Sequence, residues 1–536
     1  MPTSPDSPPA QTAVDAQPAP PPPDNSGFTP AEVSAGLAAA APLLEALVAD
    51  RGLLAGVPDA LRERFLIAAG QVSRPDKRAK RQLTKARRRG ARREQKAADQ
   101  LMLNRTGIRK LRESPIFETP RRRALLETGA PPPDAPPPAS DPIGQTHEVR
   151  TCYCCRKQHT EIHPFYDQMC LSCGDLNFAK REQTADLRGR VALVTGARVK
   201  IGFQAAIMLL RSGAHVICTT RFPKDAARRY AAEPDFADWA DRVTIHGIDL
   251  RHTPSVEAFC RHIEQQFDRL DYIINNACQT VRRPPAFYEH MMALETTAGG
   301  LSPAERRLLG PDTAVDDART ALADPSAPVA TTFGGEGESA TPSQVELLAE
   351  DRLRGNHLFP EGQLDADLQQ VDLRTVNSWR LKMADVPTIE LLEVHLVNAV
   401  APYILNARLK PLMMRTPERD KHIVNVSAME GQFYRVFKTD RHPHTNMAKA
   451  SLNMMTRTSA IDYKADGIHM NSVDTGWVTD EDPAEQAKAK REIHRFHPPL
   501  DIVDGAARIT DPIFTSALTG EHVWGQFLKD YVPTDW

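Results

Sequence analysis

The sequence lacks a long apolar run, a surplus of one charge and a dense set of cysteines, and each shortage excludes a class of protein. No stretch approaches the roughly 20 apolar residues that cross a bilayer. The acidic, proline-rich start has neither the basic nor the apolar segment of a secretory leader. We therefore expect a cytoplasmic protein with no membrane span. Eight cysteines in 536 residues are too few to form a disulfide framework for a chain of this length.

The formal net charge of −2 conceals a separation of charge along the chain. Residues 74–123 carry 19 basic and 5 acidic side chains, a local net charge of +14, which leaves −16 for the remainder. Few aromatic residues interrupt this basic segment, so the sequence does not indicate base stacking. The segment suits contact with a phosphate backbone or another polyanion. A solvated helix, or contact with the acidic body of the same or another subunit, remains open as an alternative.

Proline-rich tracts divide the chain into regions of different character. A capping-box pattern, Thr29-Pro30-Ala31-Glu32, predicts the first helix. Residues 295–346 are rich in Gly, Ala, Pro and Asp without periodicity, which predicts a flexible insertion. We expect a disordered tail at 1–28, a helical, strongly basic region at 29–125, a proline-rich linker at 126–150, a cysteine-rich module at 151–181 and an α/β domain at 187–536.

The cysteine-rich module contains two Cys-x-x-Cys pairs. Cys152 and Cys155 form the first pair and Cys170 and Cys173 the second, and 14 residues separate the two pairs. Two such turns can place four thiolates around one tetrahedral Zn²⁺ ion, which leaves no open position for catalysis. The spacing therefore predicts a structural zinc site. Cys154 is left over, and substitution of one ligand by a histidine at 159 or 163 stays open as an alternative.

From residue 187 onward, short apolar segments alternate with helical ones. Strands are predicted at 190–196, 215–220, 243–250 and 270–277, with helices at 201–212 and 255–267. Such alternation predicts an α/β fold with a Rossmann-type, doubly wound parallel sheet.

The first of these strands ends in Thr195-Gly196-Ala197-Arg198-Val199-Lys200-Ile201-Gly202 and runs directly into a helix. A tight turn before a helix N-terminus offers backbone N–H groups to a pyrophosphate. Here the chain resembles the short-chain dehydrogenase/reductase superfamily, whose turn reads T-G-x-x-x-G-I-G. Lys200 stands where that family has its middle glycine.

Further family segments follow in the family's order. They are Asp249-Leu250, Asn275-Asn276-Ala277, Asn398, Val424-Asn425-Val426-Ser427, Lys449-Ala450-Ser451 and Thr475-Gly476. The resemblance implies an oxidoreductase that uses a nicotinamide cofactor, acts on a small molecule and assembles as a homo-oligomer. It implies cofactor contacts from Gly196, Arg198, Lys200, Ile201, Gly202, Arg221, Asp249, Leu250, Asn276, Ala277, Lys449 and Gly476.

The charge near the second strand favours NADP, with NAD as the alternative cofactor. An NAD site usually places a carboxylate at the end of that strand, whereas a 2′-phosphate needs a cation. Here the strand ends in Thr219-Thr220-Arg221, and Arg198 and Lys200 lie in the phosphate turn. Two further arginines, Arg282 and Arg283, suggest an anionic substrate.

The catalytic positions match the family only in part. Asn398 and Lys449 agree with it, but Thr445 stands where the family has tyrosine, and Ser427 lies one position before its serine. A threonine hydroxyl can hydrogen-bond a substrate oxygen but is a poor general acid or base. Tyr434, which begins a literal Tyr-x-x-x-Lys, is an alternative proton donor. Other candidates at the same strand ends are His442, His444 and Asp474.

Two functions from different classes fit these observations. The first is an NADP-dependent oxidoreductase of the short-chain type with a non-standard active site. The second is a catalytically degenerate NAD(P)-binding sensor or scaffold, whose zinc module and basic arm bind a nucleic acid, a ribosome or a protein. Retention of the cofactor residues favours the first function, and replacement of both family hydroxyls favours the second.

Overall fold

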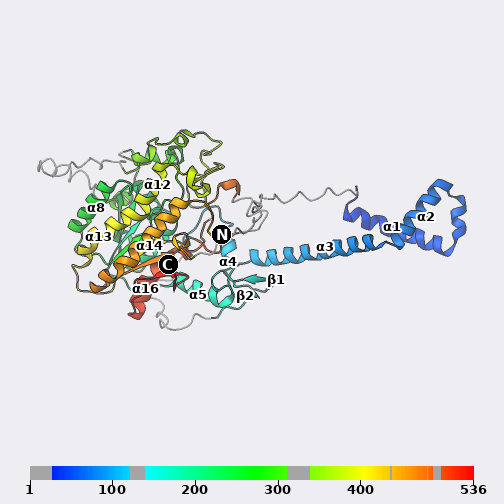
Figure 1. Ribbon diagram of the computed structural model, residues 1–536, viewed down its shortest axis with the longest axis horizontal. Coiled ribbons are helices and arrows are strands. Elements are labelled where there is room, and N and C mark those ends of the chain that lie inside the picture. Colours follow the sequence, from blue (N-terminus) through cyan, green and yellow to red (C-terminus); the bar gives the residue numbers. More distant parts are fainter. Residues whose placement is uncertain are drawn as a thin grey trace, which may run out of the picture. The chain divides into compact units, whose positions relative to one another are not determined.

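The computed structural model describes residues 27–120, 139–297, 299–310, 339–434, 438–479, 481–486 and 497–536 (Figure 1). The chain divides into two compact units, one ending at Arg93 and one spanning Glu94–Trp536. Most of the predicted tail at 1–28 and much of the predicted linker at 126–150 lie outside the described residues.

The first unit is helical. Helix α1 (Pro30–Ala49) begins with the predicted capping box, in which the Thr29 hydroxyl accepts from the Glu32 N–H and the Glu32 carboxylate accepts from the Thr29 N–H. After it come α2 (Asp59–Ser73) and the basic helix α3 (Lys77–Asn104), which continues into the second unit.

Two helical stretches are long and apolar enough to cross a membrane by length and composition. One is Ala31–Ala49 in the first unit, where no residue of the tested window is buried. The other is Thr388–Met413, which contributes Leu405, Leu409 and Leu412 to the core of the second unit. The first stretch is therefore an apolar surface of α1, and the second is a core helix.

The cysteine-rich module opens the second unit, after α4 (Gly107–Leu111). Its strands β1 (Gln145–Thr151) and β2 (Gln158–Glu161) pair in antiparallel fashion, and α5 (Leu171–Glu182) closes the module. Tyr166 and Met169 pack with Ile108 of α4 and with Ile502 and Val503. One apolar cluster thus joins the module to the α/β domain.

The α/β domain is built on an eight-stranded sheet with strand order β10-β9-β8-β7-β6-β3-β4-β5. All neighbours are parallel except β9 and β10. The order reverses at β3, which creates the crevice where doubly wound sheets bind nucleotides. The predicted α/β fold is confirmed. The strands are β3 (Val191–Thr195), β4 (His215–Thr220), β5 (Val243–Gly247), β6 (Tyr272–Asn275), β7 (Lys421–Ser427), β8 (Ile468–Asp474), β9 (Phe527–Lys529) and β10 (Val532–Thr534).

Helices cover both faces of the sheet (Figure 1). One apolar layer unites α6 (Lys200–Arg211), α7 (Pro223–Ala231) and α16 (Ile502–Thr519), and the other unites α8 (Thr253–Gln266), α13 (Ala401–Met413) and α14 (Pro443–Ala465). Successive side chains of a strand point to opposite faces. Accordingly, Val424 of β7 lies in the first layer and Ile423 in the second.

Part of the predicted flexible insertion is ordered. Within it, α10 (Pro303–Arg307) leads to Leu309, which bridges to Ile245 of the edge strand β5. The Ile245 N–H donates to the Leu308 carbonyl at 2.7 Å, so this segment satisfies backbone groups that an edge strand leaves open. The expectation of a wholly unpacked segment is wrong for these residues, and 311–338 lie outside the described part.

The remaining elements are short. They are α9 (Glu289–Glu295), α12 (Thr388–His395), the π-helical turn Leu396–Val400, and 3₁₀ turns at Arg51–Gly56, Phe236–Asp238, Ala240–Arg242, Pro285–Phe287, Thr341–Gln344, Ala349–Arg352, Ser378–Arg380, Met383–Asp385 and Met429–Gly431.

Candidate functional site

A cavity of about 1540 Å³ opens at the carboxyl ends of the parallel strands. All twelve residues predicted to contact the cofactor line it. The turn after β3, the end of β4, the segments after β5 and β6, and the start of α14 therefore converge on one space. This is the position that the reversal of strand order assigns to a nucleotide.

The phosphate turn requires glycine at two positions. Gly196 has φ +66°, and a Cβ atom there would lie 2.9 Å from the Ala277 Cα. A Cβ atom on Gly202 would lie 2.3 Å from the Gly196 carbonyl oxygen. The residue that precedes α6, Val199, makes no side-chain capping bond. The first N–H groups of α6 are thus left for an anion, as a pyrophosphate site requires.

Lys200 occupies the position of the missing glycine, with φ 56°. A residue with a side chain is strained in this left-handed region. Lys200 also lies close enough to Glu481 to shift its ionisation. Burial opposes ionisation of Glu481, but Lys200, Arg283 and hydrogen bonds from Thr479 and Thr280 together outweigh burial, and the pKa lies below its ordinary value. The ammonium group is therefore balanced in part by a carboxylate of this chain.

The other two cations predicted at the cofactor site, Arg198 and Arg221, differ in their partners within the chain. The guanidinium of Arg198 is buried and donates to the Asp225 carboxylate at 2.7 Å. The guanidinium of Arg221 donates to the Tyr288 hydroxyl at 2.9 Å and lies over the rings of Phe222 and Tyr288, 5.5 and 4.8 Å from their centroids. Within the described ranges, no carboxylate forms an ion pair with Arg221. Arg221 thus keeps a positive charge at the end of β4.

Of the predicted catalytic residues, Ser427 and Lys449 line the cavity. The Lys449 ammonium donates to the Val426 carbonyl at 2.7 Å. The Ser427 hydroxyl is buried and has no hydrogen-bond partner within the part of the chain that the structure describes. A buried polar atom of this kind is costly unless a ligand or water satisfies it.

Two further catalytic predictions, Thr445 and Tyr434, do not reach the cavity. Thr445 is buried but is not among the lining residues, and Tyr434 is 83 % exposed and does not line the cavity either. On α14 the lining positions are instead His442, Asn446 and Lys449, which share one helix face because they are four and three residues apart. The structure thus leaves both predicted hydroxyl donors outside the cavity wall.

Asn398 lies in the π-helical turn between α12 and α13 and is buried. Its side chain accepts from the Gln279 N–H at 2.7 Å and donates to the Gln279 carbonyl at 3.1 Å. Gln279 lines the cavity, whereas Asn398 does not. Asn398 therefore fixes the loop after β6, and the π-turn is what points its amide there.

Asp474 and His442 line the cavity near Ser427. Asp474 ends β8 in register with Ser427 at the end of β7, and burial raises its pKa to about 6. His442 stacks on Trp379 with ring centroids 3.9 Å apart, and burial lowers its pKa. His444 is the third of these candidates. Its Nε2 atom instead lies 3.5 Å from the Glu390 carboxylate.

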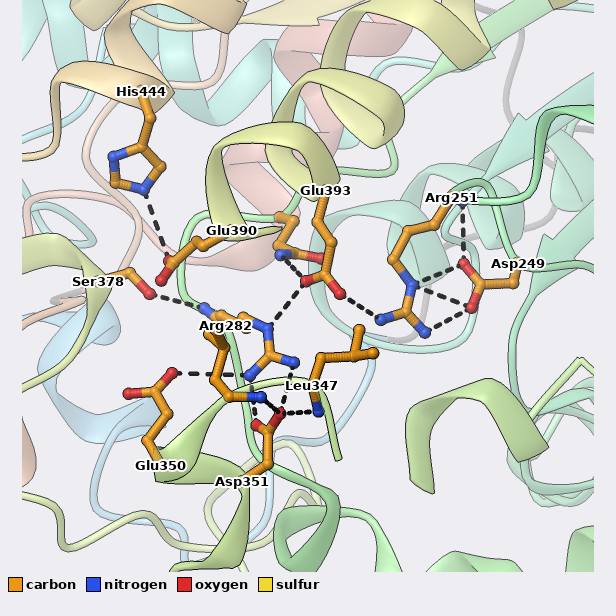
Figure 2. A network of polar contacts seen from close by, with 12 residues as sticks. Asp249, Arg251, Arg282, Leu347, Glu350, Asp351, Ser378, Glu390, Glu393 and His444 are labelled. Atoms are coloured by element: carbon orange, nitrogen blue, oxygen red, sulfur yellow. Dashed lines mark hydrogen bonds and ion pairs between the residues drawn. The ribbon is translucent and has the colours of Figure 1, made fainter. Parts of the chain in front are cut away.

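A network of buried ion pairs borders the site (Figure 2). Arg282 pairs with Asp351 and, at 3.1 Å, with Glu393, which also pairs at 3.0 Å with Arg251. Arg251 in turn holds the Asp249 carboxylate at 2.6 Å. Arg283 pairs with a further carboxylate, that of Asp372. The two arginines that suggested an anionic substrate are thus neutralised within the chain, and they give that expectation no support.

The four predicted metal ligands come together in the cysteine-rich module. The sulfur atoms of Cys152, Cys155, Cys170 and Cys173 lie within 4.8 Å of one another, and the Cys155 and Cys170 sulfurs are 3.7 Å apart. Tetrahedral zinc with Zn–S bonds of about 2.3 Å requires sulfurs roughly 3.8 Å apart. The donor set therefore fits zinc, which would supply cross-linking of the two turns and no chemistry.

The alternative ligands lie outside the group of four sulfur atoms. The His163 ring accepts from the N–H groups of Phe165 and Tyr166, and the His159 ring bonds the Glu161 carbonyl at 2.9 Å. The spare Cys154 contacts Asn177 at 3.7 Å. The candidate ligands are therefore the four cysteines.

The module also contributes to the cavity wall, which the sequence does not reveal. Thr151, Tyr153, Arg156 and Gln168 line it, and the Tyr153 hydroxyl accepts from the Trp477 N–H at 2.9 Å. A Cβ atom on Gly476 would lie 3.0 Å from this hydroxyl. No residue pattern signals this contact, because it depends on how the module packs on the loop after β8.

Comparison with known proteins identifies the α/β domain. Residues 190–295 match the short chain dehydrogenase family, and residues 375–501 match the enoyl-(acyl carrier protein) reductase family. A protein of Acanthamoeba polyphaga mimivirus, described as uncharacterized protein R665, is 28 % identical over 68 % of this chain and 72 % of its own length. The WW domain-containing oxidoreductase of Drosophila melanogaster is 38 % identical over 17 % of this chain and 23 % of its own.

Among solved structures, the NADPH-bound carbonyl reductase from chicken fatty liver is 16 % identical, with a TM-score of 0.39 over 65 % of this chain and 100 % of its own. The two family matches follow each other on the doubly wound sheet and flank the inserted segment. The chain belongs to the short-chain dehydrogenase/reductase superfamily, which is a family of oxidoreductases.

Proposed function

We propose that this chain is an NADP(H)-dependent oxidoreductase of a small carbonyl or alcohol, with an active site that differs from the family's usual one. The observation that carries the cofactor choice is Arg221, whose guanidinium lies over the rings of Phe222 and Tyr288 and forms no ion pair with a carboxylate in the described part of the chain. A 2′-phosphate would supply the anion that this cation lacks.

The phosphate turn supports the same proposal. Gly196 and Gly202 keep side chains out of the space beside the first turn of α6, whose N–H groups suit the pyrophosphate. When bound, the nicotinamide would supply the hydride. The residues of this chain hold the nucleotide, exclude water and handle the proton.

For the proton we propose Asp474 as the donor, with Ser427 positioning the substrate oxygen. Burial raises the pKa of the Asp474 carboxyl to about 6, so that a part of it is protonated near that pH. Asp474 on β8 pairs in register with Ser427 on the neighbouring strand β7. Lys449 lines the same cavity, and we expect it to contact the cofactor ribose as the family's lysine does. Thr445 and Tyr434, the donors that the sequence predicts, remain testable through Thr445→Ala and Tyr434→Phe, and we expect both variants to turn over like the parent protein.

The cofactor proposal is tested by titrating NADPH and NADH against the full chain and following the change in nicotinamide fluorescence. We expect Arg221→Ala to weaken NADPH about tenfold or more, since hydrogen bonds between charged groups are worth roughly 1.5–3 kcal/mol, and to leave NADH nearly unchanged. Arg228→Ala is the matched control, because that guanidinium bonds the Gly300 carbonyl and does not line the cavity. Equal losses for NADPH and NADH would contradict the assignment.

The second candidate, a nucleotide-binding sensor or scaffold in the cytoplasm, is favoured by the position of Thr445 and Tyr434 outside the cavity wall. It predicts NADPH binding without turnover on any member of a broad panel of aldehydes, ketones and alcohols. Oxidation of NADPH by one such compound, lost in Asp474→Asn, would rule this candidate out.

A further inference from the structure

Three histidines gather at the end of the sheet opposite the cofactor cavity. His422 is the second residue of β7 and His469 the second residue of β8, and the two strands pair with these residues in register. Parallel neighbours in register point to the same face of a sheet. His522 reaches them from the loop between α16 and β9. Ring centroids are 5.3 Å apart for His422 and His469, and 4.3 Å for His469 and His522.

We propose that His422, His469 and His522 form a second metal site that binds a divalent transition-metal ion such as Zn²⁺. One ring nitrogen from each residue lies within 4.8 Å of those of the other two. Imidazole is a ligand suited to zinc, copper and nickel. Tetrahedral zinc with Zn–N bonds of about 2.0–2.1 Å needs nitrogens roughly 3.3 Å apart, so small side-chain adjustments close the site.

The hydrogen bonds around these rings leave nitrogens for an ion. The His469 Nδ1 lies 3.2 Å from the Lys421 carbonyl and must donate to it, which leaves Nε2 with a lone pair. The His522 Nδ1 lies 2.6 Å from the Ser516 hydroxyl, and in the tautomer whose Nδ1–H donates to that oxygen, Nε2 also keeps its lone pair. Metal-binding histidines usually have their second nitrogen held by such a partner.

His422 supplies the independent observation that points to a ligand. Its side chain is 1 % exposed, and neither ring nitrogen has a hydrogen-bond partner within the described residues. Buried polar atoms are expensive to leave unsatisfied.

The location indicates a structural role. His422 stands five residues before Ser427 on the same strand, roughly 16 Å from the cofactor end at about 3.3 Å per residue. An ion held here would fasten the loop that carries His522 to β7 and β8. That loop leads into β9, whose last residue, Lys529, lines the cofactor cavity. The site would therefore fix the C-terminal strands without taking part in hydride transfer.

The test is the zinc content of untagged full-length protein after equilibration with micromolar Zn²⁺ and removal of free metal. We expect about two zinc ions per chain for the parent protein and about one for His522→Gln, a loop substitution that leaves the strands intact. His262→Gln is the matched control, because His262 is a half-buried histidine packed against another, His246. It should keep both ions.

A second variant distinguishes metal binding by the three histidines from a purely structural role of their side chains. Ser516→Ala removes the partner of His522 and keeps all three rings, and such losses typically weaken metal affinity 10- to 100-fold. Once the four cysteines hold their ion, further Zn²⁺ should raise the melting temperature of the parent and of His262→Gln but not of His522→Gln, since an ion that binds only the folded chain stabilises it. Equal zinc content and equal melting shifts in parent and His522→Gln would overturn the proposal. Neither readout depends on NADPH binding or turnover.

Discussion

At the scale of single residues, Asp474 carries the strongest prediction about chemistry. Burial raises its pKa from 3.8 to about 6, so the folded chain holds the proton more tightly than the unfolded chain does. Between about pH 4 and 6 the folded state therefore binds more protons, and stability falls as pH rises through this window. Above it, the ionised carboxylate costs about 3 kcal/mol.

Asp474→Asn should thus stabilise the protein by about 2–3 kcal/mol at pH 8 and change little at pH 4. Reduction of a carbonyl substrate should fall about 10²- to 10⁴-fold in the variant, and in the parent it should decline as pH rises above about 6. The measurements are denaturant unfolding at both pH values and a pH–rate profile. Asp241→Asn, with a carboxylate 84 % exposed, is the control. Unchanged turnover in Asp474→Asn would remove its role as proton donor.

How far single residues could be predicted depends on what determines their position. The cofactor residues lie at strand ends and in a turn, and a sequence pattern fixes such places, so all twelve line the cavity. The face of α14 that lines the cavity was not predictable, because it depends on where the helix begins. The helix begins at Pro443, directly after His442, whose backbone is in the left-handed conformation. Arg282 and Arg283 suggested a ligand, but their carboxylate partners lie more than 60 residues further along the chain.

At the scale of elements, the sequence predicts the first four strands of the α/β domain and two of the three helices between them, and it misses α7. The predicted strand at 215–220 has the bounds of β4, and the helix predicted at 201–212 is α6, shifted by one residue. The short strands β9 and β10 were missed because three residues are too few to show a period. The β-bridge between Leu309 and Ile245 was missed because an edge strand pairs through backbone groups, so the side chains of its partner carry no signal of the pairing.

The cysteine-rich module yields an element-scale prediction. Cys155→Ser should lose the zinc ion and increase amide hydrogen exchange throughout 145–182, because the two turns have few other cross-links. Since Tyr153 and Gln168 of the module line the cavity, the same variant should weaken NADPH binding severalfold. Cys154→Ser is the matched control, as its sulfur lies outside the four-cysteine group. Equal zinc content in the two variants would show that the four cysteines do not hold the metal.

At the scale of the whole molecule, positive and negative charge are segregated along the chain. The acidic remainder contains the dinucleotide fold, and the basic segment is largely α3, along which basic side chains are exposed. A helix with so little apolar surface gains no stability from a core of its own. We therefore propose that α3 binds a polyanion, which requires no change in the oxidoreductase domain.

Retention of the full chain on heparin or on duplex DNA at increasing salt tests this role. Each phosphate contact contributes about 0.9 to the slope of log affinity against log salt for a B-form duplex. Arg87→Gln with Arg88→Gln should therefore lower the slope by roughly 1.8, because both side chains are exposed on α3. Arg408→Gln with Arg419→Gln removes the same charge from exposed positions in the α/β domain and should leave the slope unchanged. Equal reductions in both double variants would mean that retention follows net charge and not the basic helix.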